Sequence, residues 1–297
     1  MRGGSVGAGT CDVCGGTAVY PVFIRHGQQV WSCRGCGVRF LHPQPSDAVL
    51  QSIYTAGYFL GGDDADGRAR TATLKARTAS SYLDRIRVFR GGEGGRLLEV
   101  GCGDGWFLEA AQARGYDVRG AEISSHAVAE ANRRLGAARV AAGALEDIAL
   151  DEETFDVVVC ADVVEHIRWP IPFLKRLRAA LKPGGAAFIV TPALDSWSSR
   201  VLRRHWMEYK VEHLFYFGRR SLRLALRKAG FDEPHIEGNR KVLTIDYLAH
   251  HFRRYPVPLL SPWVALGRRL VPPLLALRPW RIPASGMAAF ARRPPAP

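Results

Sequence analysis

Between residues 96 and 191 the chain alternates short apolar runs with segments whose apolar residues recur every three or four positions. The run at 155–161 is apolar almost throughout, which is typical of a strand buried on both faces. Strands that alternate with helices form parallel sheets with helices packed on both sides. The sequence therefore predicts an α/β fold with a Rossmann-like, doubly wound sheet. The expected strands are 96–100, 116–123, 138–142, 155–161 and 186–191.

The length and composition are those of a globular protein with one large domain or two. The chain has 297 residues, of which 47% are hydrophobic and 23% charged, so collagen-like, coiled-coil and wholly disordered classes are excluded. Lysine and arginine number 41 against 28 acidic residues, a net charge of +13. Such a charge suits an anionic partner (a nucleic acid, an acidic membrane surface or a phosphorylated substrate) without choosing among them.

The first ten residues contain one arginine and lack the apolar core of an export signal. No run approaches the ~18 consecutive apolar residues of a membrane span. We therefore expect a cytoplasmic location, where the six cysteines stay reduced rather than forming disulfides.

Four of the cysteines form two pairs, Cys11-x2-Cys14 and Cys33-x2-Cys36, separated by 18 residues. Two thiolates three positions apart can bind one ion from a tight turn, and two such turns close a tetrahedral zinc site. With four sulfur ligands the site has no open position, so the zinc would be structural. The alternative is four unrelated core cysteines. We expect a zinc ribbon over residues 1–45, because a module this small cannot build a sufficient core.

A glycine-rich turn follows the first expected strand. It reads Glu99-Val-Gly101-Cys-Gly103-Asp-Gly105, and Glu122 ends the next strand. Glycines allow a sharp turn and close approach to a ligand, and a carboxylate at the second strand tip can accept hydrogen bonds from ribose hydroxyls. A pyrophosphate site needs a further glycine where Trp106 stands. The pattern favours a nucleoside with a cationic amine, although a purely structural turn is the alternative.

Four segments, LLEVGCGDGWFLEAA, VRGAEIS, FDVVVCADVVEHI and LKPGGAAFIVTP, occur in this order. Together they resemble the class I S-adenosylmethionine-dependent methyltransferases, over about residues 96–293. The N-terminal part resembles the zinc modules of bacterial glycan and natural-product methyltransferases, including deoxysugar C-methyltransferases. The expected organisation is therefore a ribbon at 1–45, a helical linker or lid at 46–95, and a methyltransferase domain at 96–297 with a cap insertion at about 195–281.

The resemblance also implies roles for individual residues around S-adenosylmethionine. Glu99, Gly101 and Gly103 would hold the methionine part of this cofactor, and Glu122 would bind its ribose. Where the family often has an acidic residue near the adenine, this chain has Ala144, so adenine contacts would come from Leu145 and backbone groups. Asp162 would line the methyl-transfer pocket.

Glu212 and His213 are the candidate catalytic base. Imidazole titrates near neutrality, and the segment resembles a Glu-His-x-x-Tyr-Phe stretch of related methyltransferases. Sugar C-methyltransferases have a tyrosine two residues before the glutamate, whereas Lys210 stands here with Tyr209 beside it. The alternative is a histidine that only orders a lid.

Asp162, Glu165 and His166 have a spacing that could bind a divalent ion, and the oxygen ligands would suit Mg²⁺. Ubiquinone-pathway O-methyltransferases have a similar Glu-x-x-Glu-His segment. The alternative is that His166 braces the following helix.

Residues 251–281 combine six arginines with tryptophans and apolar runs. We favour a cap that packs over the catalytic domain, because the prolines interrupt any long amphipathic helix; the alternative is a peripheral contact with the inner membrane face. For the whole chain, the leading hypothesis is methyl transfer to a small-molecule acceptor such as a sugar, glycan intermediate or secondary metabolite. The two others are an RNA methyltransferase and a non-catalytic zinc-ribbon binding protein.

Overall fold

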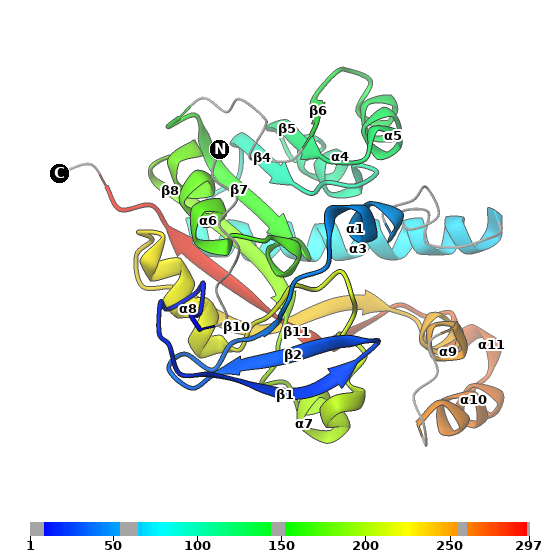
Figure 1. Ribbon diagram of the computed structural model, residues 1–297. Coiled ribbons are helices and arrows are strands. Elements are labelled where there is room, and N and C mark those ends of the chain that lie inside the picture. Colours follow the sequence, from blue (N-terminus) through cyan, green and yellow to red (C-terminus); the bar gives the residue numbers. More distant parts are fainter. Residues whose placement is uncertain (1–8, 54–64, 144–151, 255–259, 296–297) are drawn as a thin grey trace.

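The computed structural model describes residues 9–53, 65–143, 152–254 and 260–295. A seven-stranded sheet in the order β10-β11-β8-β7-β4-β5-β6 forms the centre (Figure 1). The five strands from β8 to the edge strand β6 run parallel, whereas β11 is antiparallel to β8 and β10 is antiparallel to β11. The predicted fold class is therefore confirmed. The strands are β4 (Gly95–Val100), β5 (Tyr116–Glu122), β6 (Val140–Ala142), β7 (Phe155–Ala161), β8 (Leu181–Pro192), β10 (His235–Leu243) and β11 (Trp280–Arg292).

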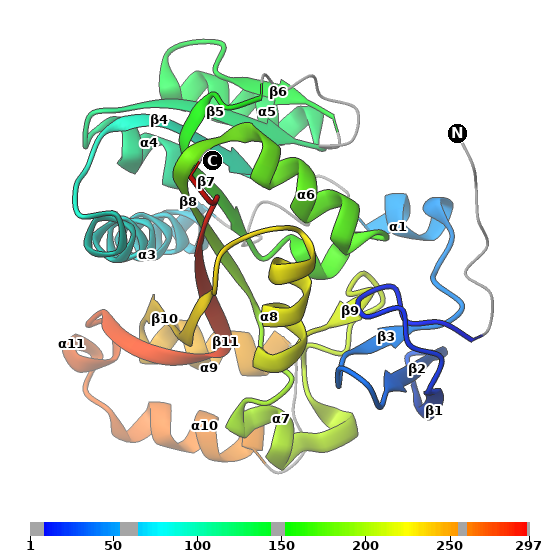
Figure 2. The same cartoon turned by 90° about the vertical axis from the view of Figure 1, so that its left-hand side faces the viewer.

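Helices cover both faces of this sheet, because alternate side chains of each buried strand enter opposite cores. Val157 and Val159 pack with one set of helices, and Val158 and Cys160 with the other. Figure 2 shows the two layers on either side of the strands. The first comprises α3 (Ala65–Arg90), α4 (Trp106–Gln112) and α5 (Ser125–Leu135), and the second comprises α6 (Pro170–Ala180) and α8 (Arg219–Lys228).

A second, four-stranded sheet contains the N-terminal module, and its last strand comes from the middle of the chain. Three strands, β1 (Val19–Arg25), β2 (Gln28–Cys33) and β3 (Arg39–Leu41), are followed by α1 (Asp47–Ile53). The fourth strand is β9 (Phe215–Tyr216), which pairs with β3. The N-terminal module and the second helical layer thus share one hydrophobic core.

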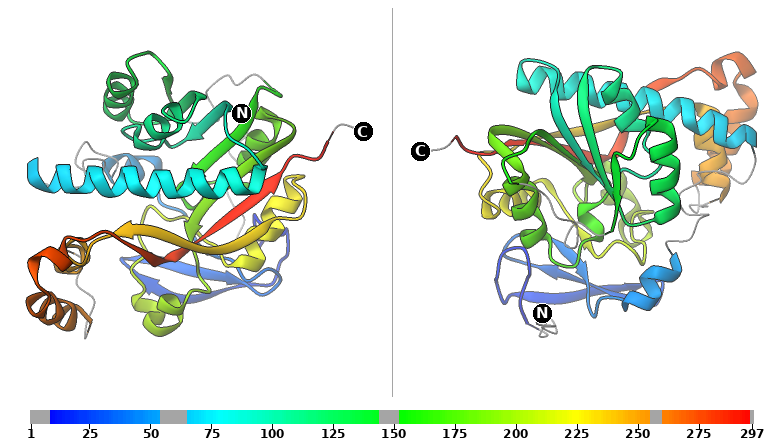
Figure 3. Two further views of the ribbon diagram at one scale, coloured as in Figure 1. Left: turned by 180° about the vertical axis from the view of Figure 1, so that it is seen from behind. Right: turned by 90° about the horizontal axis from the view of Figure 1, so that it is seen from above.

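Residues 195–281 do two things: some of them form elements of the central fold, and others form an added helical unit. α7 (Trp197–Leu202), the short 3-10 turn η2 (Arg203–His205), β9, α8 and β10 come first, and β10 belongs to the central sheet. In the sequence, three helices follow β10 and precede β11. They extend beyond the sheet (Figure 3). They are α9 (Ile245–Arg254), α10 (Leu260–Leu270) and α11 (Pro273–Ala276). None of the described helices is long and apolar enough to cross a membrane.

Candidate functional site

A cavity of about 360 Å³ lies at the carboxyl ends of β4, β7 and β10, under the helix α3. This is the edge at which doubly wound sheets bind their ligands. The volume is that of a small-molecule site. Its walls combine three carboxylates and two ammonium groups with aromatic rings: Glu99, Asp104, Asp162, Lys75, Lys241, Tyr82, Trp106, Phe107 and Tyr247.

The glycine-rich turn forms one wall, and its conformation excludes side chains at two positions. Gly101 has φ 72°, and a Cβ there would lie 2.3 Å from Cγ2 of Val163. Gly105 has φ 82° and packs against Ala131 of α5. Gly103, with φ 52°, faces open space in the cavity wall. The turn can therefore bring its backbone directly against a ligand.

Glu99 is a buried carboxylate in the cavity wall, and its Oε2 has no hydrogen-bond partner among the described residues. Burial, together with the nearby charges of Glu122 and Asp104, raises the pKa of Glu99 well above its usual range. A buried carboxyl without a partner is costly unless a cationic or hydrogen-bond-donating ligand meets it. The amine and sulfonium of S-adenosylmethionine fit this requirement.

Glu122 is also buried, and both of its oxygens accept backbone hydrogen bonds. Oε2 accepts from Gly103 N–H at 2.9 Å, and Oε1 accepts from Ser124 N–H at 3.0 Å. The side chain thus joins the glycine turn to the start of α5, and Glu122 is not among the residues that line the cavity. Leu145, predicted beside the adenine, lies outside the described residues.

The helix α3 contributes a wall that the sequence analysis did not assign to the site. Four of its cavity-lining residues recur at spacings of four, three and four: Thr71, Lys75, Thr78 and Tyr82. Lys75 Nζ lies 3.1 Å from Asp104 Oδ1, which ties the helix to the glycine turn. The Tyr82 hydroxyl accepts a 2.8 Å hydrogen bond from Asn239 Nδ2 of β10. Residues at this i, i+4, i+7, i+11 spacing lie on one face of a helix, and this spacing is the sequence feature that could have identified the face toward the cavity.

The pair formed by Asp162 and Lys241 is the second feature that sequence reasoning missed. Asp162 directly follows β7 with the left-handed φ of 56°, and its Oδ2 lies 2.7 Å from Nζ of Lys241. Burial acts to lower the pKa of Lys241, but the charge of Asp162 outweighs it, so that the pKa is raised and the ammonium stays charged. Asp162 lines the cavity with a cation beside it, and its place in a methyl-transfer pocket stays a prediction.

Glu212 and His213, predicted as the base, are buried and are not among the residues that line the cavity. His213 Nδ1 is 2.9 Å from the carbonyl oxygen of Glu208, and its ring meets the His166 ring edge to face at 4.7 Å. Burial, followed by the charges of His166 and Lys210, lowers the pKa of His213 well below its usual range. The imidazole is therefore neutral at physiological pH.

The structure groups Glu165 and His166 with His213, whose candidate ligand atoms lie within 4.8 Å of one another. Asp162, the third member of the expected Mg²⁺ set, pairs with Lys241 instead. Thr191 Oγ1 donates a 2.9 Å hydrogen bond to Glu165 Oε2, and Oε1 is buried without a partner among the described residues. Burial, then repulsion from Asp162, raises the pKa of Glu165 to about 8.

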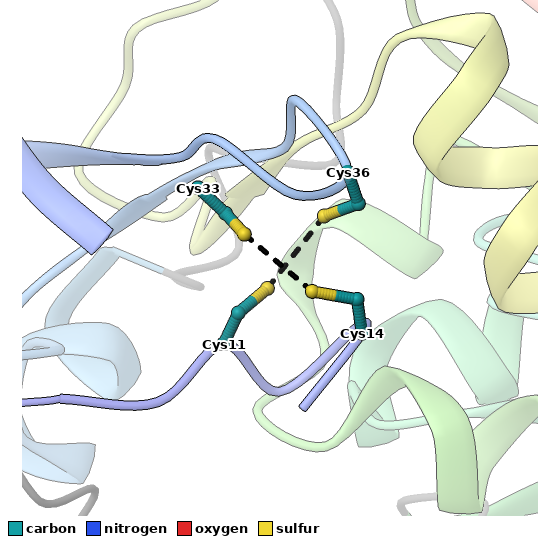
Figure 4. A group of neighbouring side chains, drawn as sticks. All are labelled: Cys11, Cys14, Cys33 and Cys36. Carbon is teal, nitrogen blue, oxygen red and sulfur yellow. Dashed lines mark hydrogen bonds between the residues drawn. The ribbon is translucent and has the colours of Figure 1, made fainter. Parts of the chain in front are cut away.

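The four paired cysteines converge on one point in the N-terminal module (Figure 4). The Sγ atoms of Cys11 and Cys36 are 3.7 Å apart, and those of Cys14 and Cys33 are 3.5 Å apart. All four sulfur atoms lie within 4.8 Å of one another, and none of these four cysteines forms a disulfide. The sequence prediction of a four-cysteine cluster is thus confirmed.

The fold is that of the class I S-adenosylmethionine-dependent methyltransferases. A family model described as a methyltransferase domain matches residues 73–233, more than half of the chain. The chain belongs to this methyltransferase family.

Curated relatives are ubiquinone biosynthesis O-methyltransferases. Those of Parvibaculum lavamentivorans and Schizosaccharomyces pombe are 32% and 31% identical over 41% and 43% of this chain. The chain spans about half the length of these relatives, 50% and 49%.

Solved structures share the fold at low identity. The Burkholderia thailandensis 1,6-didemethyltoxoflavin N1-methyltransferase is 17% identical with a TM-score of 0.51, covering 92% of this chain and 99% of that one. A Haemonchus contortus N-methyltransferase, solved with S-adenosylhomocysteine, is 18% identical with a TM-score of 0.53, covering 93% and 72%.

Proposed function

We propose that the protein transfers the methyl group of S-adenosylmethionine to a hydroxyl group of a small-molecule acceptor. The observation that carries the proposal is the cavity itself, in which an unpartnered buried carboxylate, Glu99, and the Asp162–Lys241 pair line one space. The names of the curated relatives support oxygen as the methylated atom. Sugars, glycan intermediates and secondary metabolites are the acceptors we favour.

The residues that would hold the cofactor are those of the glycine turn and the two strand-end glutamates. Glu99 would meet the methionine amine, Gly101 and Gly103 would allow close backbone approach, and Glu122 would accept a ribose hydroxyl. Leu145 is proposed beside the adenine on the resemblance alone. When bound, the cofactor supplies a methyl group on an already activated leaving group, so the protein's main task is alignment.

We propose that Asp162 takes the proton of the acceptor hydroxyl and that Lys241 stabilises the oxygen as negative charge develops on it. Both side chains line the cavity and are in direct contact at 2.7 Å. A positioned base typically contributes ~10²–10⁴-fold to the rate, and an ammonium beside a developing oxyanion adds electrostatic stabilisation. For Glu212 and His213 we propose a positioning role: the Glu212 carbonyl oxygen lies 2.9 Å from His166 Nδ1, in the turn that follows Asp162.

We further propose that the four cysteines bind one structural zinc ion. A tetrahedral site with Zn–S bonds of ~2.3 Å places its sulfur atoms ~3.8 Å apart, close to the 3.5 and 3.7 Å of the two measured pairs. Gly15 and Gly37 follow the two pairs with φ of 80° and 79°, the backbone turn that each metal-binding loop requires. Four sulfur ligands leave no position for a substrate.

The test is methyl transfer by the purified protein from methyl-labelled S-adenosylmethionine into fractionated cell extract, read by mass spectrometry. The expected result is one or a few small molecules that gain a methyl ether and that do not appear with the Asp162→Asn variant. Labelled RNA in place of small molecules, with a steep salt dependence, would support the RNA alternative instead. Absence of cofactor binding by calorimetry would refute the proposal and favour a binding protein.

A further inference from the structure

Exposed apolar side chains are concentrated on the helices inserted between β10 and β11. Sixteen large hydrophobic side chains are exposed in the described residues, and seven of them fall within residues 263–280. Isolated exposed apolar residues need no explanation, but a contiguous group marks an interaction surface. We call this group the α10–α11 surface; its members are Trp263, Leu266, Leu270, Leu274, Leu275, Leu277 and Trp280.

The helix α10 presents its apolar residues on one side. Trp263, Leu266 and Leu270 follow one another at spacings of three and four, and they are 71%, 47% and 77% exposed. The helix packs against α9, and α11 follows it directly. Figure 3 shows this unit extending away from the central sheet. The surface therefore faces outward.

The charges around the α10–α11 surface have one predominant sign. Residues 244–281 contain six arginines and a single acidic residue, Asp246. Asp246 pairs with Arg268 at 3.0 Å, and the Arg278 guanidinium lies 4.9 Å from the Trp280 ring centre. Arg253 and Arg269 are exposed. An outward apolar surface with tryptophans and arginines at its border has the composition of a membrane-interface element.

The inserted unit that carries this surface starts at the candidate active site. Leu243, the last residue of β10, and Tyr247, in the first turns of α9, both line the cavity. The inserted unit thus begins at the cavity wall and ends in the exposed surface.

We propose that the α10–α11 surface docks the protein onto a bilayer that contains anionic lipids. Tryptophan and leucine would enter the headgroup region, and the arginines would contact lipid phosphates. A second copy of the chain is a poorer occupant, because a two-fold interface places the same patch on both sides and would oppose one arginine cluster to another. The proposal goes beyond the methyl-transfer reaction and does not depend on it.

The experiment is co-sedimentation of the full-length protein with vesicles, either of phosphatidylcholine alone or of an equimolar mixture with phosphatidylglycerol. We expect binding to the mixed vesicles, at least about tenfold weaker binding to the neutral ones, and a loss on adding salt. A triple variant, Trp263→Ser, Leu270→Ser and Leu274→Ser, should bind the mixed vesicles at least about tenfold more weakly than the unmodified protein.

The matched control removes three equally exposed apolar residues elsewhere, by Val88→Ser, Trp197→Ser and Val201→Ser, and should bind like the unmodified protein. Thermal unfolding and cofactor titration establish that both triple variants are folded. Failure to bind mixed vesicles, equal binding to neutral ones, or equal losses in the two triple variants would each overturn the proposal. Self-association that the first triple variant abolishes, without vesicle binding, would assign the surface to a second copy instead.

Discussion

The Asp162 carboxylate and the Lys241 ammonium are 2.7 Å apart in the cavity wall, although 79 positions separate them in the chain. Asp162 follows the central parallel strand β7. Lys241 lies near the carboxyl end of β10, the edge strand that pairs with β11. The carboxyl ends of these strands meet at one edge of the sheet. The pair is therefore a product of the topology, and under the proposed function it would supply the acid–base chemistry at the cavity, which His166 and His213 do not line.

Replacing Asp162 with asparagine should lower the methyl-transfer rate by about 100-fold or more, because the proton acceptor is lost while the shape is kept. Lys241→Met should lower it by a similar factor through loss of oxyanion stabilisation. Steady-state kinetics with the identified acceptor measures both effects, and calorimetry should find cofactor affinity changed by less than about threefold. Asp195→Asn, which removes a 3.0 Å pair with Arg219 that is not in the cavity wall, is the control. A normal rate in both cavity variants would place the base elsewhere.

Glu99→Gln should weaken S-adenosylmethionine binding by about tenfold or more, because the carboxylate that meets the cationic amine becomes neutral. The same change should stabilise the ligand-free protein near neutral pH. The pKa of Glu99 is raised in the folded state, so its contribution to folding is present below its unfolded pKa and is lost as the pH rises through the folded value. Calorimetry and thermal unfolding measure the two effects. Unchanged affinity would exclude Glu99 from the cofactor site.

Glu165 should make stability depend on pH across the neutral range. Its folded pKa of about 8 lies above the ordinary value of 4.5. Its contribution is therefore complete below about pH 4.5 and is lost as the pH rises through about 8. Glu165→Gln should flatten this decline, which we expect to be on the order of a few kcal/mol. Denaturant unfolding across that range measures it; Glu152→Gln, at an exposed position, should leave the slope as it is. Equal slopes in the two variants would contradict the prediction.

Glu122→Ala should reduce cofactor affinity by about tenfold or more, by removing the ribose acceptor and releasing the N–H groups of Gly103 and Ser124. Glu122→Gln keeps one acceptor oxygen and should lose less. Isothermal titration of both variants gives the order. If both bind as tightly as the unmodified protein, the ribose assignment fails.

Elemental analysis of the purified protein should find about one zinc per chain, and Cys14→Ser with Cys36→Ser should abolish it. Unfolding should then begin at residues 10–41, where hydrogen exchange would rise first. Cys102→Ala, in the cavity wall, should leave the zinc content unchanged. Protein that holds no metal after growth with added zinc would contradict the assignment.

The central fold could be predicted where periodicity and burial agree. The expected strand 155–161 matches β7, because a strand buried on both faces is apolar throughout. The glycine turn and the cysteine cluster could also be predicted, because their residues are adjacent or regularly spaced in the sequence. Their roles in binding S-adenosylmethionine and zinc remain predictions.

The missed parts of the site depend on pairing between distant segments. Lys75 and Tyr82 lie in the segment predicted only as a helical linker or lid, and Lys241 lies on an edge strand of the sheet. These residues are brought together only when α3 packs over β10. One direct link between them is the hydrogen bond from Val242 N–H to Thr78 Oγ1, at 3.0 Å. His213 was predicted as a base from its type and motif, and its burial against His166 could not be read from the sequence.

The two-residue strand β9 affects whether the N-terminal module can be separated from the rest of the protein during evolution. Phe215 and Tyr216 complete the sheet that the N-terminal module begins. The module is therefore part of the same folded unit as the catalytic domain and is not a separate domain in front of it. A gene rearrangement that moved the first fifty codons to another enzyme would leave an unpaired strand edge in each product. Recombination would therefore tend to keep the two regions together as a single evolutionary unit.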